Sequence, residues 1–141
     1  MANGGDLELQ AAINARLAAD PNVQALLGTP PRIYQDVPAN GVPVFPYALL
    51  GESSEIDNSA PQCGLASDIS TDIHVWSRQP GFEEVKRIAW AIRVSLHNAD
   101  LALATQRCVL IEHSVTRHLR DGEIPVKHAI LTFHANVEES A

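Results

Sequence analysis

Residues 68–77, which read DISTDIHVWS, decide the fold class of this chain because they predict a strand that leads directly into a helix. Apolar or β-branched side chains occupy the odd positions between Ile69 and Val75, and polar side chains occupy the even positions between Asp68 and His74. Successive side chains of a strand point to opposite faces, so this alternation predicts a strand with one buried face. Trp76 then lies on the outer, polar face of the same strand.

A break at residues 77–81, SRQPG, separates this strand from a helix. The helix has one continuous apolar stripe at helical spacing, made of Phe82, Val85, Ile88, Ala89, Ile92 and Leu96. We expect it to end near His97 and Asn98. Its polar side is locally basic, through Arg78, Lys86, Arg87 and Arg93. That side is either a solvated surface or a contact surface for an acidic partner.

Two helical segments open the chain. Asp6 can cap the first, whose apolar side carries Leu9, Ala12, Ile13 and Leu17. Polar residues lie away from that side, namely Glu8, Asn14 and Arg16. Asp20 and Pro21 restart the helix, because an aspartate caps well and proline suits the first helical position. The second segment has the apolar residues Val23, Leu26 and Leu27 and can end at Gly28, so the pair predicts a bent helical hairpin or a kinked helix.

Short strands and loops are expected between these helices and residue 68. Residues 32–35 and 45–50 are typical of strands. The segment between them favours an extended, irregular path because it contains Pro38, Pro43, Asn40 and Gly41. Residues 51–67 are small and polar without a helical period, which predicts a long loop or the tip of a protruding hairpin.

The last third of the chain predicts a β-hairpin of residues 107–119 and 126–137. A two-residue turn at Asp121 and Gly122 would place Leu131 opposite Glu112 and mix the two faces. A three-residue loop, with Gly122 in the left-handed conformation, places odd positions opposite odd positions. We expect this second register, in which one face carries Val109, Ile111, Val115, Ala129, Leu131, Phe133, Ala135 and Val137.

The other face of this hairpin is only partly polar. Cys108, Leu110, Val126 and Ile130 lie there among Glu112, His128, Thr132 and His134. Part of that face is therefore expected to be covered, either by a helix of the same chain or by a neighbouring subunit. The residues that we expect at a subunit or partner interface are Trp76, Arg78, Leu110, Ile130, Asn40 and Asp57.

These elements together predict an α+β fold. We expect a mostly antiparallel four- to five-stranded sheet with helices packed on it and a C-terminal β-hairpin. The chain has 141 residues, of which 45% are hydrophobic, and this suits one core and a single domain over residues 1–141.

Charge and composition exclude several classes of protein. The 10 Lys and Arg against 17 Asp and Glu give a net charge of −7, and a protein that coats nucleic acid needs a concentrated basic surface instead. The longest uncharged stretch, residues 37–51, is broken by prolines and is too short to span a membrane. The first residues do not form a secretory signal, so we expect a cytoplasmic product. Cys63 and Cys108 lie far apart without a Cys-x-x-Cys pattern, which fits a reducing compartment.

No pattern predicts a catalytic, cofactor-binding or metal-binding residue. His74 can share a sheet face with Asp72, but His128 and His134 lie about 20 Å apart along one strand and cannot contact the same ion. Neither cysteine has a basic or helix-start context that would activate its thiol. Gly81 stands alone where a phosphate-binding loop would need further glycines. We therefore expect no cofactor and no enzymatic activity.

Several segments resemble, in order and spacing, the tail terminator or tail-completion proteins of long-tailed bacteriophages and phage-derived gene-transfer particles. They are LQAAI (9–13), LAAD (17–20), VQALLG (23–28), RIY (32–34), FPY (45–47), DIHVWS (72–77), GF (81–82) with its helix, and DG (121–122). The resemblance runs from residue 6 to about residue 138, and its motifs are structural rather than catalytic. Residues 53–67 follow no motif of the family.

The resemblance implies a commonly hexameric ring that caps the finished tail tube and faces the head connector. Its partners would be further copies of itself, the tail tube protein and the head–tail connector protein, with no membrane contact. DNA would pass through the bore without specific binding, since acidic walls do not hold its backbone. The protein would assemble in the host cytoplasm and then reside at the head–tail junction of a virion or phage-like particle.

Two alternatives from other classes stay open. One is a different head-to-tail connector component or a tail tube subunit, of which the tube subunit would polymerise into long open tubes. The more distant one is a small enzyme or ligand-binding domain that uses the outer-face histidines and Asp72. That alternative needs a pocket and a bound ligand.

Overall fold

The computed structural model describes residues 4–36, 43–122 and 126–140. The elements in this part of the chain are α1 (Gly5–Ala19), α2 (Pro21–Leu27), β1 (Ile33–Tyr34), β2 (Tyr47–Asp57), β3 (Ala66–Ser77), α3 (Glu83–Leu96), β4 (Gln106–Asp121) and β5 (Val126–Glu139). The strands form one sheet in the order β1-β2-β3-β5-β4. β1 pairs with β2 in parallel, and the other neighbouring strands are antiparallel. The predicted α+β fold with a mostly antiparallel sheet is confirmed.

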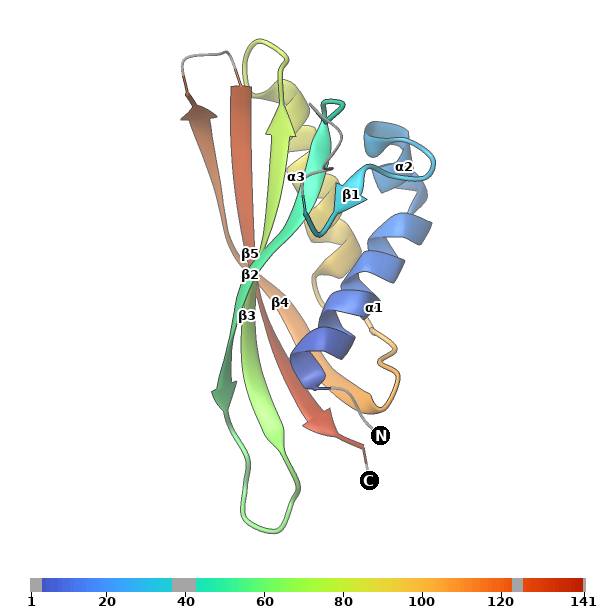
Figure 1. Ribbon diagram of the computed structural model, residues 1–141, viewed down its shortest axis with the longest axis vertical. Coiled ribbons are helices and arrows are strands. Elements are labelled where there is room, and N and C mark those ends of the chain that lie inside the picture. Colours follow the sequence, from blue (N-terminus) through green and yellow to red (C-terminus); the bar gives the residue numbers. More distant parts are fainter. Residues whose placement is uncertain (1–3, 37–42, 123–125, 141) are drawn as a thin grey trace.

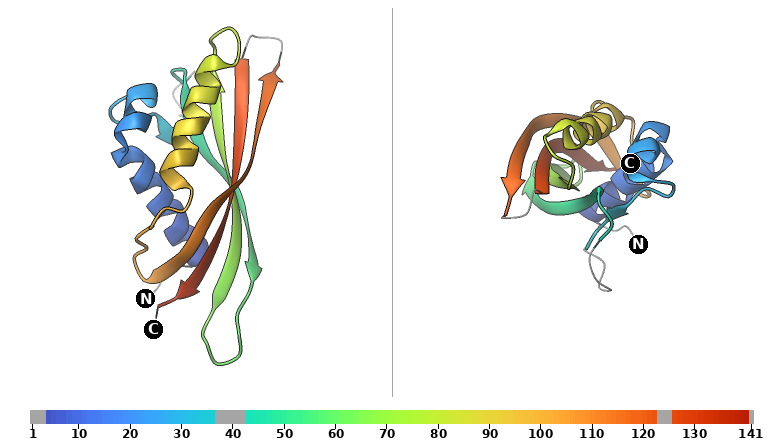
Figure 2. Two further views of the ribbon diagram at one scale, coloured as in Figure 1. Left: turned by 180° about the vertical axis from the view of Figure 1, so that it is seen from behind. Right: turned by 90° about the horizontal axis from the view of Figure 1, so that it is seen from above.

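All three helices lie on one face of the sheet (Figure 1, Figure 2). We call the opposite face the outer face. Within the described residues no helix covers it. Of the two covers expected from the sequence, a helix of the same chain or a neighbouring subunit, the first is therefore not found among these residues. Among those residues, too, no helix combines the length and the hydropathy needed to span a bilayer.

The core lies between the helices and the inner face of the sheet. The predicted stripe of α3 is buried over Val85, Ile88, Ala89, Ile92 and Leu96. It packs on the odd positions of the two central strands, among them Ile69, Ile73, Val75, Leu131 and Phe133. Both predicted periodicities are therefore confirmed, because the side chains that recur at helical or strand spacing meet in one core.

Glu8 departs from the sequence prediction, which placed it on the polar side of the first helix. Its residue surface is only 4% exposed. Its carboxylate accepts hydrogen bonds from the backbone N–H groups of Thr105, at 2.7 Å, and Gln106, at 2.9 Å, and from the hydroxyl of Thr105. The glutamate thus supplies acceptors to the backbone where β4 begins, and this explains its burial.

The register predicted for the C-terminal hairpin is wrong, although Gly122 has the predicted positive φ, 73°. Asp121 pairs with Val126, so β4 extends further than expected and residues 122–125 connect the strands. Residues 123–125 lie outside the described part of the chain. Leu131 pairs with Thr116, so odd positions do not face odd positions beside the turn.

Two irregularities in β4 change the register again further along the strand. They lie between residues 108 and 110 and between residues 113 and 115. An extra residue in one strand shifts the alternation of the side chains that follow it. Ile111 is consequently buried as predicted, but Val109 and Val115 are 50% and 44% exposed.

Residues 51–67 form a hairpin, which was one of the two predicted alternatives. β2 continues to Asp57 and β3 begins at Ala66, with the N–H of Asn58 donating to the carbonyl of Ala66 at 2.8 Å. This β2–β3 hairpin extends beyond the ends of the helices (Figure 1). Its tip is therefore far from the core and available for contacts outside the subunit.

Candidate functional site

Stacked rings occupy the outer face where β2, β3 and β5 lie side by side. Tyr47 stacks on Trp76 with ring centroids 5.1 Å apart, and Trp76 stacks on His128 at 4.4 Å. His74 stacks on His128 at 5.0 Å. The strand register produces this cluster, because Trp76 pairs with Tyr47 on one side and with His128 on the other. We call these four residues the ring cluster.

Hydrogen bonds orient the rings. The indole Nε1 of Trp76 donates to the Oδ2 of Asp121 at 3.2 Å. The Nδ1 of His74 and the Nε2 of His128 are 2.8 Å apart and share one hydrogen bond. The Nε2 of His74 lies 3.1 Å from the Oε2 of Glu52. Each of the three polar rings is thus held by a named partner, and the cluster forms a defined surface.

The surroundings favour uncharged forms of two of these rings. Burial lowers the pKa of His128, and the neighbouring His74 lowers it further, against the opposite effect of Asp121. Burial also raises the pKa of Tyr47, and the charge of Asp121 acts in the same direction. His128 and Tyr47 are therefore neutral at pH 7, which suits a surface that packs against another protein.

Gly51 allows His74 to approach the backbone of β2. A Cβ at this position would lie 2.6 Å and 2.7 Å from the Cδ2 and Nε2 of the His74 ring and 3.0 Å from the carbonyl oxygen of Asp72. No side chain fits there without moving the ring. No sequence pattern singles out this glycine, because the close approach comes from the neighbouring strand.

Three of the residues expected at an interface lie in or next to the ring cluster, namely Trp76, Ile130 and Arg78. Ile130 pairs with His74, two residues from Trp76 along β3, so both side chains lie on the outer face. Arg78 follows β3, and its guanidinium lies 4.3 Å from the centre of the Phe45 ring, which itself contacts Tyr47 edge to face.

Leu110 and Asp57 lie in the half of the sheet that carries the β2–β3 hairpin. Leu110 belongs to a row across the outer face that reads Ile56, Asp68, Asn136 and Leu110. Asp57 ends β2 next to this row. Asn40 lies outside the described residues. The structure therefore spreads the expected interface residues over two regions instead of one patch.

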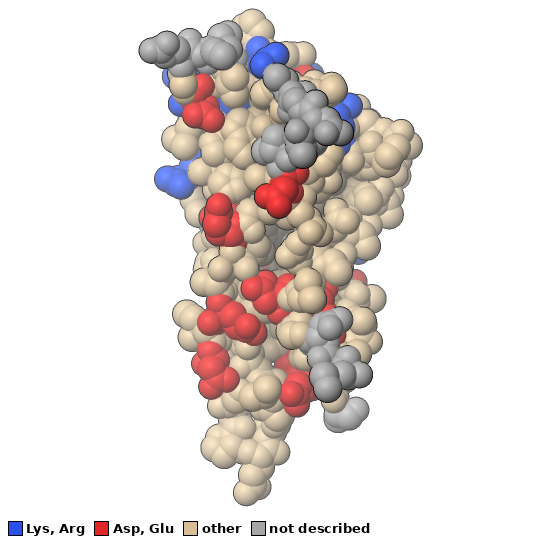
Figure 3. Space-filling model, in the orientation of Figure 1, with Lys and Arg blue, Asp and Glu red and all other residues tan. Residues whose placement is uncertain are grey.

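Acidic side chains gather on the surface between the ring cluster and the tip of the β2–β3 hairpin (Figure 3). The exposed members of this acidic surface are Glu52, Glu55, Asp57 and Asp68. Lys and Arg side chains lie nearer the opposite end of the molecule in the same view. The net negative charge of the chain is thus unevenly distributed.

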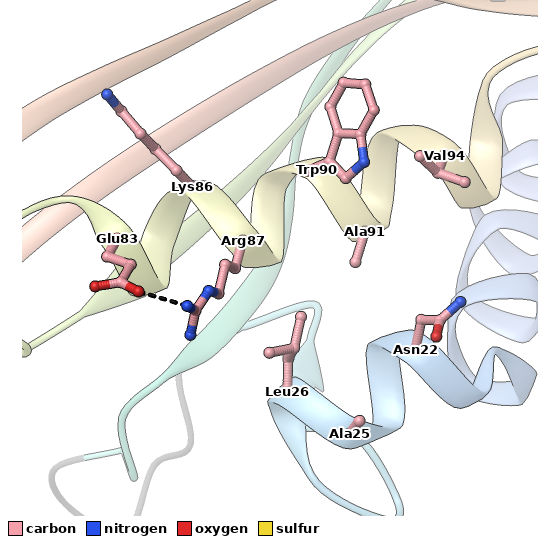
Figure 4. A pocket seen from close by; sticks show the side chains of 9 residues that line it. All are labelled: Asn22, Ala25, Leu26, Glu83, Lys86, Arg87, Trp90, Ala91 and Val94. Carbon is pink, nitrogen blue, oxygen red and sulfur yellow. Dashed lines mark hydrogen bonds and ion pairs between the residues drawn. The ribbon is translucent and has the colours of Figure 1, made fainter.

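A second surface, which sequence reasoning missed, is a groove between α2 and α3 (Figure 4). It has a volume of about 810 Å³ and an apolar floor of Ala25, Leu26 and Ala91. Trp90 and Val94 stand on its α3 side and are 62% and 58% exposed. The signal in the sequence is their spacing, because these large apolar residues lie four positions apart on the polar side of α3.

One group of described residues brings possible metal ligands together. Ligand atoms of Glu52, Asp72 and His74 lie within 4.8 Å of one another. Both ring nitrogens of His74 already have hydrogen-bond partners, and Asp72 accepts a hydrogen bond from Thr132 at 2.7 Å. A cation would have to displace these contacts, and the absence of a metal site stays a prediction.

Cys108, one of the two cysteines, is half-buried, and burial raises the pKa of its thiol. A raised pKa disfavours the thiolate, which is the nucleophilic form. Cys63 is exposed in the loop of the β2–β3 hairpin. The absence of a catalytic cysteine stays a prediction.

Comparison with known proteins agrees with the resemblance seen in the sequence. The family model described as "Tail completion protein gp17" matches residues 11–138. A chain in the solved structure titled "Virion of native gene transfer agent (GTA) particle" has a TM-score of 0.87 and 30% sequence identity, and the match covers 97% of this chain and 99% of that chain. A comparison with curated proteins found no match. This chain therefore belongs to the tail completion protein gp17 family and is a structural protein of a phage-like tail.

Proposed function

We propose that this chain forms a homo-hexameric ring that terminates the tail tube of a phage or phage-like particle and joins it to the head connector. Membership of a tail completion family supports a role at the end of tail assembly. The similar chain in a gene transfer agent virion supports a place in such a particle. Each subunit is a single domain without an enzymatic role, and the subunits assemble into the ring in the host cytoplasm.

The observation that carries the proposal is the uncovered outer face. Trp76 and Ile130 lie on it beside neutral rings, yet no described helix of the subunit packs there. Apolar surface of this kind is stabilised when a neighbouring protein covers it. A contact between two different surfaces of identical subunits closes into a ring when its rotation permits.

The charge distribution supports passage of DNA without specific binding. The chain carries a net charge of −7, so a ring of such chains is acidic as a whole. Phosphate groups are not held by an acidic wall, so DNA in the bore of the ring remains free to move. The tail tube protein and the head connector are the remaining partners.

Electron microscopy of intact particles tests this function. Averaged images of particles in which this chain is labelled should show one hexameric ring where the tail meets the head. Label distributed along the whole tail would make the chain a tube subunit, and a ring of another symmetry or position would make it a different connector component. Either result refutes tube termination.

A matched pair of variants tests the outer face. Ile130→Asp places a charge on the outer face, and Arg16→Ala removes an exposed side chain of α1 on the helix side of the sheet. We expect the first to abolish incorporation into particles while the folded state persists, as judged by circular dichroism, and the second to be incorporated normally. Normal incorporation of Ile130→Asp would refute a buried outer face.

A further inference from the structure

The groove between α2 and α3 combines apolar and basic character. Trp90 and Val94 leave more than half of their surfaces exposed beside Leu26. Large aromatic and aliphatic side chains that stand exposed around a concave surface are typical anchor points of protein contacts. The groove therefore has the composition of a binding surface for a protein segment.

Two basic side chains of α3 have no acidic ion-pair partner within the described residues, namely Lys86, which lines the groove, and Arg93, which lies next to it over Trp90. Arg87 also lines the groove, but it pairs with Glu83, the acidic residue of the lining. Lys86 has its Nζ 5.6 Å from the centre of the Phe82 ring, and Arg93 has its guanidinium 5.4 Å from the centre of the Trp90 ring. No described carboxylate forms an ion pair with Lys86 or Arg93. These two cations favour an occupant that carries acidic groups.

The β2–β3 hairpin has the complementary composition. Ile56 is 67% exposed and Leu65 is 66% exposed. Asp68 pairs with Ile56 and shares its face of the hairpin, whereas the exposed Glu55 and Asp57 point to the opposite face. No described lysine or arginine forms an ion pair with these carboxylates. The hairpin thus presents apolar side chains together with unpaired negative charge.

The two surfaces lie at opposite ends of the long axis of the subunit (Figure 1, Figure 2). The hairpin of a subunit consequently does not reach its own groove. A hairpin from a second copy meets no such restriction, and its acidic residues match the basic side of the groove. Contact between two different surfaces of identical chains is heterologous, which is the type that builds rings.

We propose that the β2–β3 hairpin of one copy docks in the α2–α3 groove of the next copy, with Ile56 against Trp90 and Val94 and with Asp68, on the same face as Ile56, toward Lys86 and Arg93. This inference rests on the proposed ring and adds a second contact between its subunits, besides the one at the outer face. It also assigns a role to residues 53–67, for which the sequence resemblance supplied no motif.

Cross-linking tests the contact with the native thiol of the hairpin. Cys63 is exposed in the loop, and Val94→Cys places a second thiol in the groove. We expect a short bismaleimide to join copies of the full-length Val94→Cys protein, in isolated particles, into a ladder that ends at the closed ring. Two controls should give no ladder: Val94→Cys with Cys63→Ser, and Arg16→Cys, which places the thiol on the exposed side of α1.

Charge reversal provides a second, independent readout. Lys86→Glu with Arg93→Glu, or Asp68→Lys alone, should each reduce incorporation into particles at least about tenfold, because like charges then meet in every contact. A chain that carries all three substitutions should recover, since each contact again joins opposite charges. Unchanged incorporation of both variants, or failure of the triple variant to recover while it remains folded, would refute the pairing.

The outcomes separate this inference from the proposed function. A ring at the head–tail junction in particles that yield no Val94→Cys ladder would refute the hairpin contact and leave tube termination intact. A cross-link from the groove to a different tail protein would show another occupant and also refute self-docking. Label along the whole tail, with the ladder present, would instead refute tube termination alone.

Discussion

Replacement of Glu8 by alanine tests how far one buried carboxylate holds the N-terminal helix to the sheet. The side chain accepts hydrogen bonds from two backbone N–H groups and one hydroxyl at the start of β4. It joins α1 to Thr105 and Gln106, which lie 97 and 98 positions further along the chain. Its loss therefore removes a long-range contact as well as a helix residue.

The magnitude follows from the number and type of these bonds. A hydrogen bond to a charged group contributes about 1.5–3 kcal/mol, and bonds to the same carboxylate do not add in full. The alanine variant also leaves the N–H groups of Thr105 and Gln106 without this acceptor. We expect Glu8→Ala to lower the free energy of unfolding by about 2–4 kcal/mol. Glu8→Gln keeps one acceptor oxygen and should cost about 1–2 kcal/mol.

Urea denaturation followed by far-UV circular dichroism measures both values. Glu83→Ala is the matched control, because Glu83 also lies in the first turn of a helix but has a side chain that is 74% exposed and, among the described residues, forms an ion pair with Arg87 alone. An exposed pair of this kind contributes about 0.5 kcal/mol or less. The reasoning is refuted if Glu8→Ala costs no more than Glu83→Ala at an unchanged dependence on urea.

Three further perturbations test the outer face and the hairpin turn. Gly51→Ala should displace the His74 ring and cost about 1–3 kcal/mol, visible as shifted histidine NMR signals and a lower midpoint in urea, and unshifted signals would contradict the close approach. Gly122→Val should cost about 1 kcal/mol or more, because φ is 73° there, and an unchanged midpoint would contradict that conformation. The pKa of His128 is lower in the folded chain than its ordinary 6.5, so the unfolded chain binds more protons and stability falls as the pH decreases from 6.5 through the folded value. The urea midpoint of His128→Asn should decline less steeply over this range than that of the unsubstituted chain, and an identical decline would contradict the lowered pKa of His128.

Some elements could be predicted because their signals are local. The alternation at residues 68–77 and the apolar stripe of α3 report directly which side chains are buried, since strands repeat every two residues and helices every 3.6. Gly122 was predictable for a similar reason, as a left-handed turn needs a residue without a Cβ. The same patterns placed Trp76 and Ile130 correctly on the outer face.

The rest depended on partners that are distant in the chain. Glu8 reads as a polar helix residue until Thr105 lies beside it, and the register of β4 depends on irregularities that only pairing with β5 reveals. The groove needs Leu26 of α2 and Trp90 of α3 side by side, and neither segment alone indicates this.

The amino-acid sequence by itself determined the order of most strands and helices and the buried faces of β3 and α3, because backbone periodicity and side-chain hydrophobicity act over a few neighbouring residues. Only the tertiary structure decided that every described helix lies on one face of the sheet and that rings from β2, β3 and β5 stack on the other. It also decided that the acidic hairpin and the basic groove lie at opposite ends of the subunit. Those arrangements arise from the packing of segments far apart in the chain, where the free energy depends on the shape and charge of both partners at once.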